Sequence, residues 1–205
     1  FLIRHFKLHY YIISMNTMIL LKLGPLLLIV NLFFSFLAAA ESNYEAKTKD
    51  IIQGDLRKFI FSDGTKTLPS PVVLDMNENV VEIGSNNDIL VINFWATWCA
   101  PCKKEMPSLN NLAENMKYDD VRIITVASGR NSKEAIESFF SDNDLVNLNK
   151  FRDPRGKIAM SYGVTALPTT VVIDPSGKEI GRIIGDIDWN TENIRAFFRN
   201  LLKNS

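Results

Sequence analysis

The sequence predicts an α/β fold in which helices cover both faces of a central mixed sheet. Two nearly continuous apolar runs, residues 88–96 and 121–127, have the length of strands that are buried on both faces. Apolar residues recur every three to four positions over 101–116 and again near the C-terminus, as in amphipathic helices. Because strands and helices alternate along the chain, we expect them to form layers around one sheet.

The first 40 residues contain no Asp or Glu and carry Arg4, Lys7 and Lys22. This basic flank is followed by an apolar run and three alanines before Glu41, which is the order of a secretory signal peptide. The run is also near the minimum length for a retained membrane anchor. In both interpretations the positive charges stay on the cytoplasmic side and the chain after residue 40 is exported.

Three regions are expected along the chain. Residues 1–40 are interpreted as an N-terminal extension plus a signal peptide or membrane anchor, with residues 1–14 as the extension because the chain starts at Phe1. Residues 41–67 are interpreted as a tether and a pre-domain segment. Residues 68–203 are expected to form the folded domain.

The elements of the domain follow from local patterns. Apolar spacing over 51–61 predicts a helical face, which Gly54 weakens, with an irregular segment packed on the domain as the alternative. Pro107 should kink the helix at 101–116. The other expected elements are a hairpin at 70–83, a helix at 131–142 that begins with a near capping box at Asn131, a short helix at 155–163, a hairpin at 169–185 and a closing helix at 194–202.

Composition excludes several functional classes. After residue 40 there are 20 basic and 23 acidic residues, so nothing indicates nucleic-acid binding. The only histidines, His5 and His9, precede that point, and a tetrahedral zinc site would need carboxylates or a second chain to complement two thiols. A c-type haem anchor would need histidine in place of Lys103, and Cys-His nucleophilic catalysis lacks its base. We therefore expect no metal or other cofactor.

Thiol-disulfide exchange remains for Cys99 and Cys102, the only cysteines. We do not expect a structural role for the pair, because a bridge that closes a loop of two residues removes little chain entropy. At the point where a buried strand gives way to a helix, Cys99 would lie at the helix N-terminus, where free N–H groups stabilise a thiolate. Cys102, one turn later, would resolve the mixed disulfide. Pro101 suits the first helical turn.

The segments VINFWATWCAPCKKEMPSL and GVTALPTTVVID together resemble the thioredoxin-like fold, and specifically the exported TlpA/ResA-like thiol-disulfide oxidoreductases. The resemblance covers most of residues 68–203. CxxC alone is a weak motif, but its combination with a preceding strand, a proline-containing helix and a later Leu-Pro-Thr-Thr is specific. The stretch before Pro168 resembles the helical insertion of this group, and residues 52–68 resemble more loosely the pre-domain segment of alphaproteobacterial TlpA proteins.

The resemblance implies roles for residues outside the CxxC motif. Pro168 would be cis and packed against the disulfide, and the backbone of Leu167 would bind an extended substrate segment; a trans proline that starts a strand is the alternative. Trp98 would lie at the rim of the active site and Trp95 in the core.

Asn93 departs from the cytoplasmic thioredoxins, which have a buried acid at this strand position. Glu105 matches an acid of the TlpA/ResA-like group and would take over the proton handling. The alternative is a solvated helix glutamate paired with a lysine.

The resemblance also implies a function. We expect a periplasmic reductase of specific protein disulfides, recharged by an inner-membrane electron donor, monomeric, and membrane-tethered if the leader is retained. The clients would be the copper-binding cysteines of a cytochrome oxidase subunit or its copper chaperone. The alternatives are reduction of apocytochrome c and, from another class, a Cu(I) carrier of the Sco type, which would need CxxxC and a distant histidine. A redox-inert binding module conflicts with an intact WCAPC.

Overall fold

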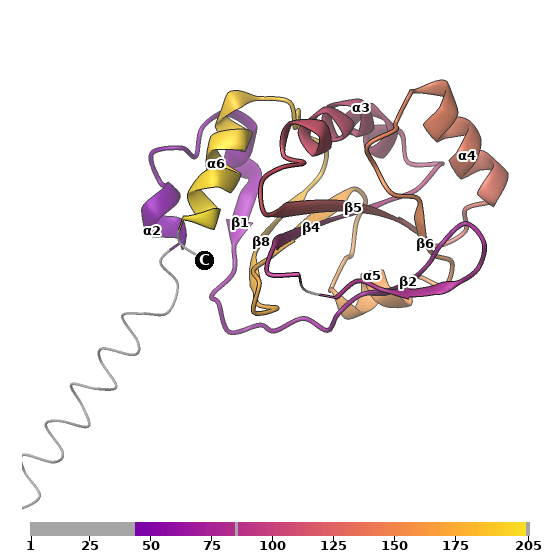
Figure 1. The fold of residues 1–205 in the computed structure, drawn as a ribbon, viewed down its shortest axis with the longest axis horizontal. Helices are drawn as coiled ribbons and strands as arrows, with labels where there is room; N and C mark the ends of the chain where they lie inside the picture. The colour runs from indigo at the N-terminus through magenta and orange to yellow at the C-terminus, as the bar shows by residue number, and fades with distance from the viewer. Residues whose placement is uncertain (1–43, 85, 204–205) are drawn as a thin grey trace, which may run out of the picture. The chain divides into compact units, whose positions relative to one another are not determined.

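The computed structural model describes residues 44–84 and 86–203, and these residues form a single sheet of eight strands. The strand order is β1-β8-β7-β4-β5-β6-β2-β3 (Figure 1). The elements are α2 (Tyr44–Thr48), η1 (Gly54–Lys58), β1 (Phe59–Phe61), β2 (Val72–Leu74), β3 (Val80–Glu82), β4 (Ile89–Trp95), α3 (Ala100–Asn115), β5 (Val121–Ser128), α4 (Lys133–Asp142), β6 (Phe151–Asp153), α5 (Lys157–Ser161), β7 (Thr169–Ile173), β8 (Glu179–Ile184) and α6 (Glu192–Leu202).

Strand β4 is the centre of the sheet, and all seven of its residues are buried. It pairs in parallel with β5 and antiparallel with β7, which confirms the predicted mixed sheet. Successive side chains point to opposite faces, so Val91 and Trp95 join one core while Ile92 and Phe94 join the other. Asn93 lies on the same face as Val91 and Trp95 and is a polar residue in an apolar row.

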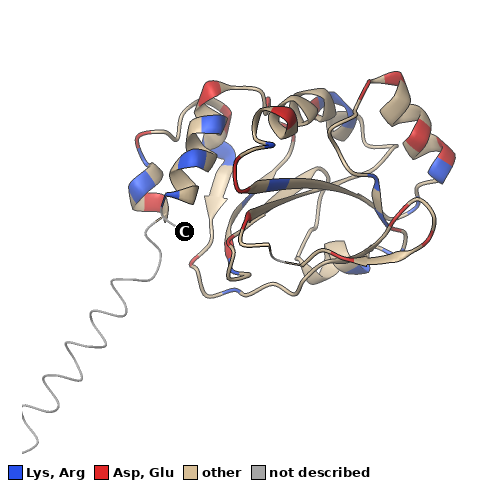
Figure 2. Cartoon of the chain, viewed as in Figure 1, with Lys and Arg blue, Asp and Glu red and all other residues tan. Residues whose placement is uncertain are grey.

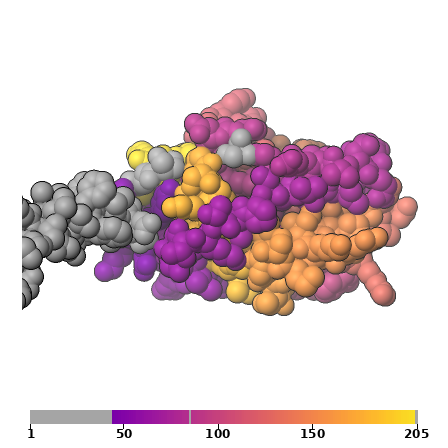
Figure 3. Space-filling model, turned by 90° about the horizontal axis from the view of Figure 1, so that it is seen from below, coloured from indigo at the N-terminus to yellow at the C-terminus, as the bar shows by residue number. Residues whose placement is uncertain are grey.

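Helices cover both faces of the sheet, as the sequence predicted. On one face, α3, α4 and α6 bury the larger core, which includes Leu109, Ile136 and Phe197. On the other face, α5 and the chain around β2 bury the smaller core, to which Tyr162 belongs. Figure 3 shows the segment that includes β2 lying alongside the segment that includes α5. The hydroxyl of Tyr162 donates a hydrogen bond to the carbonyl of Pro69 and joins these two segments.

The segment before residue 62 differs from the predicted helix at 51–61. Its chain forms the short η1 turn and then β1, which pairs antiparallel with β8 and so extends the sheet at that edge. The ring of Phe59 contacts that of Phe197 of α6 at 4.9 Å between centroids. The alternative, an irregular segment packed on the domain, is closer to the structure, because pairing with β8 rather than local periodicity decides the conformation of residues 59–61.

The region between β5 and β7 contains one strand that the sequence did not predict. Strand β6 pairs in parallel with β5 and antiparallel with β2, and it thereby attaches the β2-β3 hairpin to the sheet.

The start of α4 also differs from the prediction: Ser132 caps the helix by accepting a hydrogen bond from the amide of Ala135. Asn131, the predicted cap, instead accepts hydrogen bonds from the amide and hydroxyl of Thr97, next to the CxxC segment.

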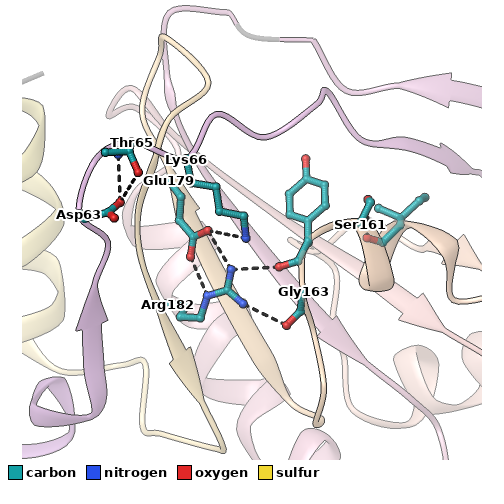
Figure 4. A network of polar contacts seen from close by, with 9 residues as sticks. Asp63, Thr65, Lys66, Ser161, Gly163, Glu179 and Arg182 are labelled. Carbon is teal, nitrogen blue, oxygen red and sulfur yellow. Dashed lines mark hydrogen bonds and ion pairs between the residues drawn. The ribbon is translucent and has the colours of Figure 1, made fainter.

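A cluster of ion pairs and hydrogen bonds around the buried Glu179 holds the chain between α5 and Pro168 (Figure 4). Arg182 of β8 donates two hydrogen bonds to the carboxylate of Glu179, at 2.6 and 2.8 Å, and Lys66 adds an ion pair at 3.3 Å. The same guanidinium donates to the carbonyl oxygens of Tyr162 and Gly163. The cluster therefore joins β8 to the segment that follows α5.

Charged residues of both signs are interspersed over the helices and loops in the view of Figure 2. Within residues 44–84 and 86–203, every helix is too short or too polar to cross a bilayer. The predicted signal peptide or anchor lies outside these residues.

Candidate active site

The CxxC motif lies where β4 ends and α3 begins, as predicted. Cys99 is the N-cap residue of α3, with an extended backbone (φ −89°, ψ 103°), and Pro101 follows in the first helical turn. The amide of Cys102 donates a hydrogen bond to Sγ of Cys99 at 3.3 Å. A helix N-terminus has unpaired N–H groups and a positive dipole end, so this position favours negative charge on Sγ.

The two cysteines form a disulfide with 5.3 Å between their Cα atoms. Cys102 is fully buried, whereas Cys99 keeps 6% of its surface exposed. Trp98 is 66% exposed directly before Cys99, so it lies at the rim of the site, and Trp95 is buried in the core. Of the two cysteines, Cys99 is therefore the less completely buried.

The Leu167–Pro168 peptide bond is cis, as the resemblance implied. Thr169, the next residue, pairs with Phe94 of β4, so the sheet register brings Pro168 to the end of β4 from which the CxxC segment emerges. The carbonyl of Pro168 accepts a hydrogen bond from the amide of Gly185 at 2.8 Å. Pro168 is buried and Leu167 is half-buried; substrate binding by the Leu167 backbone stays a prediction.

A buried polar network lies beneath the first turns of α3. Nδ2 of Asn93 donates hydrogen bonds to Oε1 of Glu105 at 2.8 Å and to the hydroxyl of Thr170 at 2.9 Å. The other carboxylate oxygen of Glu105 accepts from Nε1 of Trp189 at 2.9 Å and from the amide of Ile187 at 3.3 Å. Glu105 of α3 therefore contacts β4 and the loop before α6 directly, and Asn93 links the network to β7.

Burial raises the pKa of Glu105 to about 7, well above its usual value of 4.5. Hydrogen bonds from Trp189, Asn93 and the amide of Ile187 favour the carboxylate and offset part of this rise, while the charge of Asp186 adds to it. A carboxyl with a pKa near neutrality exchanges protons readily at physiological pH. Glu105 is 2% exposed, so the alternative of a solvated glutamate paired with a lysine is wrong.

Comparison with known proteins identifies the family. A thioredoxin-like family model matches residues 86–179. The thiol-disulfide oxidoreductase ResA of Bacillus subtilis is 34% identical over 136 residues, which cover 66% of this chain and 73% of ResA. The chain belongs to the TlpA/ResA-like thiol-disulfide oxidoreductases. It is therefore an enzyme of thiol-disulfide exchange with a thioredoxin-like fold, as the two sequence segments indicated.

Further members of this family are also similar. The DsbE homolog of Paracoccus denitrificans, a thiol:disulfide interchange protein, is 33% identical over 126 residues, which cover 62% of this chain and 64% of that protein. The crystal structure of a putative DsbE from Chlorobium tepidum superposes with a TM-score of 0.59 at 22% identity, over 67% of this chain and 96% of that one. The similarity to the Chlorobium tepidum structure shows that the two chains share a fold.

Three residues of this TlpA/ResA-like site were not predicted from the sequence: Thr170, Ile187 and Trp189. Ile187 and Trp189 donate hydrogen bonds to Glu105, and Thr170 accepts one from its partner Asn93. Trp189 is 1% exposed although its neighbours, Asp188 and Asn190, are polar. A single tryptophan in a polar stretch between a hairpin and a helix was the available signal. In the described parts of the chain, no group of three or more His, Cys, Asp or Glu side chains is placed to hold a metal ion.

Proposed function

We propose that this oxidoreductase is an exported reductase of specific protein disulfides. The observation that carries the proposal is the contrast between the two cysteines: Cys99 caps α3 and keeps 6% of its surface exposed, and Cys102 is fully buried on the same helix as Glu105. Such an asymmetric pair separates the attacking sulfur from the resolving one. Export is supported by the composition of residues 1–40, which resembles a leader.

The reaction starts from the reduced pair. The Cys99 thiolate attacks one sulfur of a substrate disulfide, forms a mixed disulfide and releases the first substrate thiolate. Cys102 then loses its proton and attacks Sγ of Cys99, which releases the second substrate thiolate and leaves the Cys99–Cys102 disulfide. Glu105 takes the Cys102 proton in this second step, because its pKa near 7 lets it exist as a carboxylate at neutral pH. An inner-membrane electron donor then returns two electrons to the pair.

Equilibration with glutathione redox buffer tests the direction. A reductase should have a potential more negative than about −250 mV, in the range of thioredoxin, whereas a value near about −120 mV would make the protein an oxidant. The Ala-Pro dipeptide between the cysteines and the lack of histidine there support the reducing assignment.

The client class requires a separate experiment. The family resemblance offers two kinds of client, the copper-site cysteines of cytochrome oxidase biogenesis and the haem-binding cysteines of apocytochrome c. The motif ALPTT favours the first. Thiol release from each oxidised client, timed with the wild type and with Cys99→Ser as the inactive control, separates them. Inertness toward both refutes both assignments, and a tight stoichiometric Cu(I) complex would favour the carrier hypothesis instead.

A further inference from the structure

The loop at 185–190 supplies two of the hydrogen-bond donors on Glu105. The amide of Ile187 and Nε1 of Trp189 both donate to Oε2 of the carboxylate. α3 holds the loop by further contacts: the amide of Trp189 donates to the hydroxyl of Ser108 at 3.1 Å, and Lys104 pairs with Asp186 at 2.8 Å. The position of the loop backbone therefore decides how many donors reach the carboxyl.

The η1 turn holds the same loop from the opposite side. Oδ2 of Asp55 accepts a hydrogen bond from the amide of Asp188 at 2.9 Å, and Nζ of Lys58 donates to the carbonyl of Asp186 at 2.7 Å. These two contacts lie on either side of Ile187 in the sequence. Between them in η1, Leu56 is 2% exposed in the larger core, so the turn has a fixed anchor.

We propose that Asp55 and Lys58 are positioning residues for thiol-disulfide exchange, because they fix the backbone at 186–188 and thereby hold the donors of this loop on the Glu105 carboxyl. The inference rests on the role of Glu105 in the proposed function. It assigns a task at the active site to the pre-domain segment, in addition to the packing and strand pairing described above.

The charges around Glu105 determine how its pKa would change if the contacts of Asp55 and Lys58 with the loop were lost. The carboxylate of Asp186 raises the pKa of Glu105, and Lys104 pairs with Asp186 at 2.8 Å. Lys58 also acts electrostatically on Asp186 and lowers its pKa, although the Lys104 hydrogen bond is the larger cause. The remaining partners of Glu105 are neutral donors. Loss of the loop donors would remove interactions that favour the carboxylate, so the pKa of Glu105 would rise.

Two substitutions at Asp55 separate position from charge. Asp55→Ala removes the acceptor for the Asp188 amide, whereas Asp55→Asn keeps an acceptor oxygen and removes only the charge. If Asp55 positions the loop, Ala raises the pKa of Glu105 by about 1, the size expected for weakening hydrogen bonds to a charged group, and Asn leaves it near the wild-type value. If Asp55 acts only by its charge, both variants lower that pKa equally.

The measurement is a pH titration of the side-chain carboxyl carbon of Glu105 in the 205-residue chain, labelled with ¹³C-glutamate and kept oxidised. The Glu105 signal is assigned by its absence in Glu105→Gln. Thermal unfolding confirms that each variant is folded. If Asp55→Ala does not fold, Lys58→Met tests the second contact, with Lys58→Arg as its conservative rescue. An unchanged or lowered pKa in a folded Asp55→Ala or Lys58→Met overturns the inference.

Kinetics then connect the contact to the reaction. The rate at which Cys102 resolves a preformed mixed disulfide is measured against pH for the wild type and Asp55→Ala, each also in a Glu105→Gln background. We expect the profile of Asp55→Ala to shift upward in pH and the difference to vanish when Glu105 is absent. A shifted carboxyl titration with an unshifted rate profile would refute the proton-transfer role of Glu105, while a difference that persists in the Glu105→Gln background would refute the positioning role of Asp55.

Discussion

The side-chain amide of Asn93 donates a hydrogen bond to the carboxyl of Glu105, with 2.8 Å between Nδ2 and Oε1. The residue that departs from the cytoplasmic thioredoxins and the residue that matches the TlpA/ResA-like group are therefore direct partners. The acid of this site comes from α3 and the strand supplies an amide that orients it. Both side chains are buried, so the contact is shielded from solvent.

Glu105→Gln should stabilise the oxidised protein at alkaline pH. The carboxyl ionises near 4.5 in the unfolded chain but only near 7 in the native state, so the native state loses stability as pH rises through this window. The gap corresponds to about 3 kcal/mol, fully expressed above the native pKa. The Oδ1 atom of Asn93 has no hydrogen-bond partner among the described residues, so this amide can turn to accept from a glutamine.

Urea unfolding of the wild type and Glu105→Gln at pH 5 and pH 8 tests this prediction. The difference in unfolding free energy should be small at pH 5 and should favour the variant at pH 8. Glu137→Gln is the matched control, because Glu137 is exposed on α4. A constant difference at the two pH values would contradict the raised pKa.

The two cysteines should respond differently to serine. Cys99→Ser should abolish turnover, because no thiolate remains at the N-terminus of α3. Cys102→Ser should keep the first attack but lose resolution, so mixed disulfides with a substrate such as insulin should accumulate on non-reducing gels. Accumulation in Cys99→Ser and none in Cys102→Ser would reverse the assigned roles.

Gly181→Ala should detach β1 from the sheet edge. A Cβ at this position would overlap the carbonyl oxygen of Ile60 and lie within 2.5 Å of the Phe59 ring. Overpacking of this kind costs about 1–3 kcal/mol of unfolding free energy. Gly84→Ala is the control, because a Cβ at position 84 meets no atom within 4 Å. Equal stability of both variants by urea unfolding would show that β1 is not held as described.

Arg182→Met should destabilise the fold by leaving the Glu179 carboxylate buried with only Lys66 nearby. Burial raises the pKa of Glu179, but the hydrogen bonds and charge of Arg182, together with Lys66, more than offset this, so its pKa lies below the usual value. Removing one partner of a buried ion pair lowers the free energy of unfolding by about 3 kcal/mol at neutral pH.

The double variant Glu179→Gln with Arg182→Met should recover most of this loss in unfolding free energy. Because the native pKa of Glu179 is lowered, the contribution of the pair should also disappear as pH falls below the usual glutamate range. A double variant no more stable than Arg182→Met would indicate that Arg182 acts mainly through the Tyr162 and Gly163 carbonyls.

Periodic patterns predicted most of this fold because they report burial directly. The continuous apolar run became β4, and the three-to-four spacing after Cys99 became α3. Strand β6 escaped prediction because its three residues, Phe-Arg-Asp, carry no apolar pattern, and only pairing with β5 and β2 makes them a strand. β1 escaped for another reason: its apolar residues also fit a helical spacing, and its partner β8 lies about 120 residues away in the sequence.

The active site likewise contains residues that local motifs predict and residues that only the tertiary structure brings together. Cys99, Cys102 and Pro168 are found by local motifs, because each role needs a particular residue at a fixed spacing. The hydrogen-bond partners of Glu105 come from β4 and from the loop before α6, and no local pattern predicts that Ile187 or Trp189 will face α3, which lies far away in the sequence. The sequence left two interpretations of Glu105, a proton-handling acid and a solvated glutamate paired with a lysine. Its burial excludes the second, and the burial of a single glutamate depends on tertiary packing, which local sequence does not show.

Alkylation of the reduced protein by iodoacetamide across a pH series tests the central claim most directly. We expect Cys99 to react as a thiolate with an apparent pKa well below the value of about 8.5 for a free cysteine, because it caps α3, and Cys102 to react slowly because it is buried. Mass spectrometry of the labelled peptides distinguishes the two sites. If both thiols react at similar rates and titrate near about 8.5, the division into an attacking and a resolving cysteine is wrong.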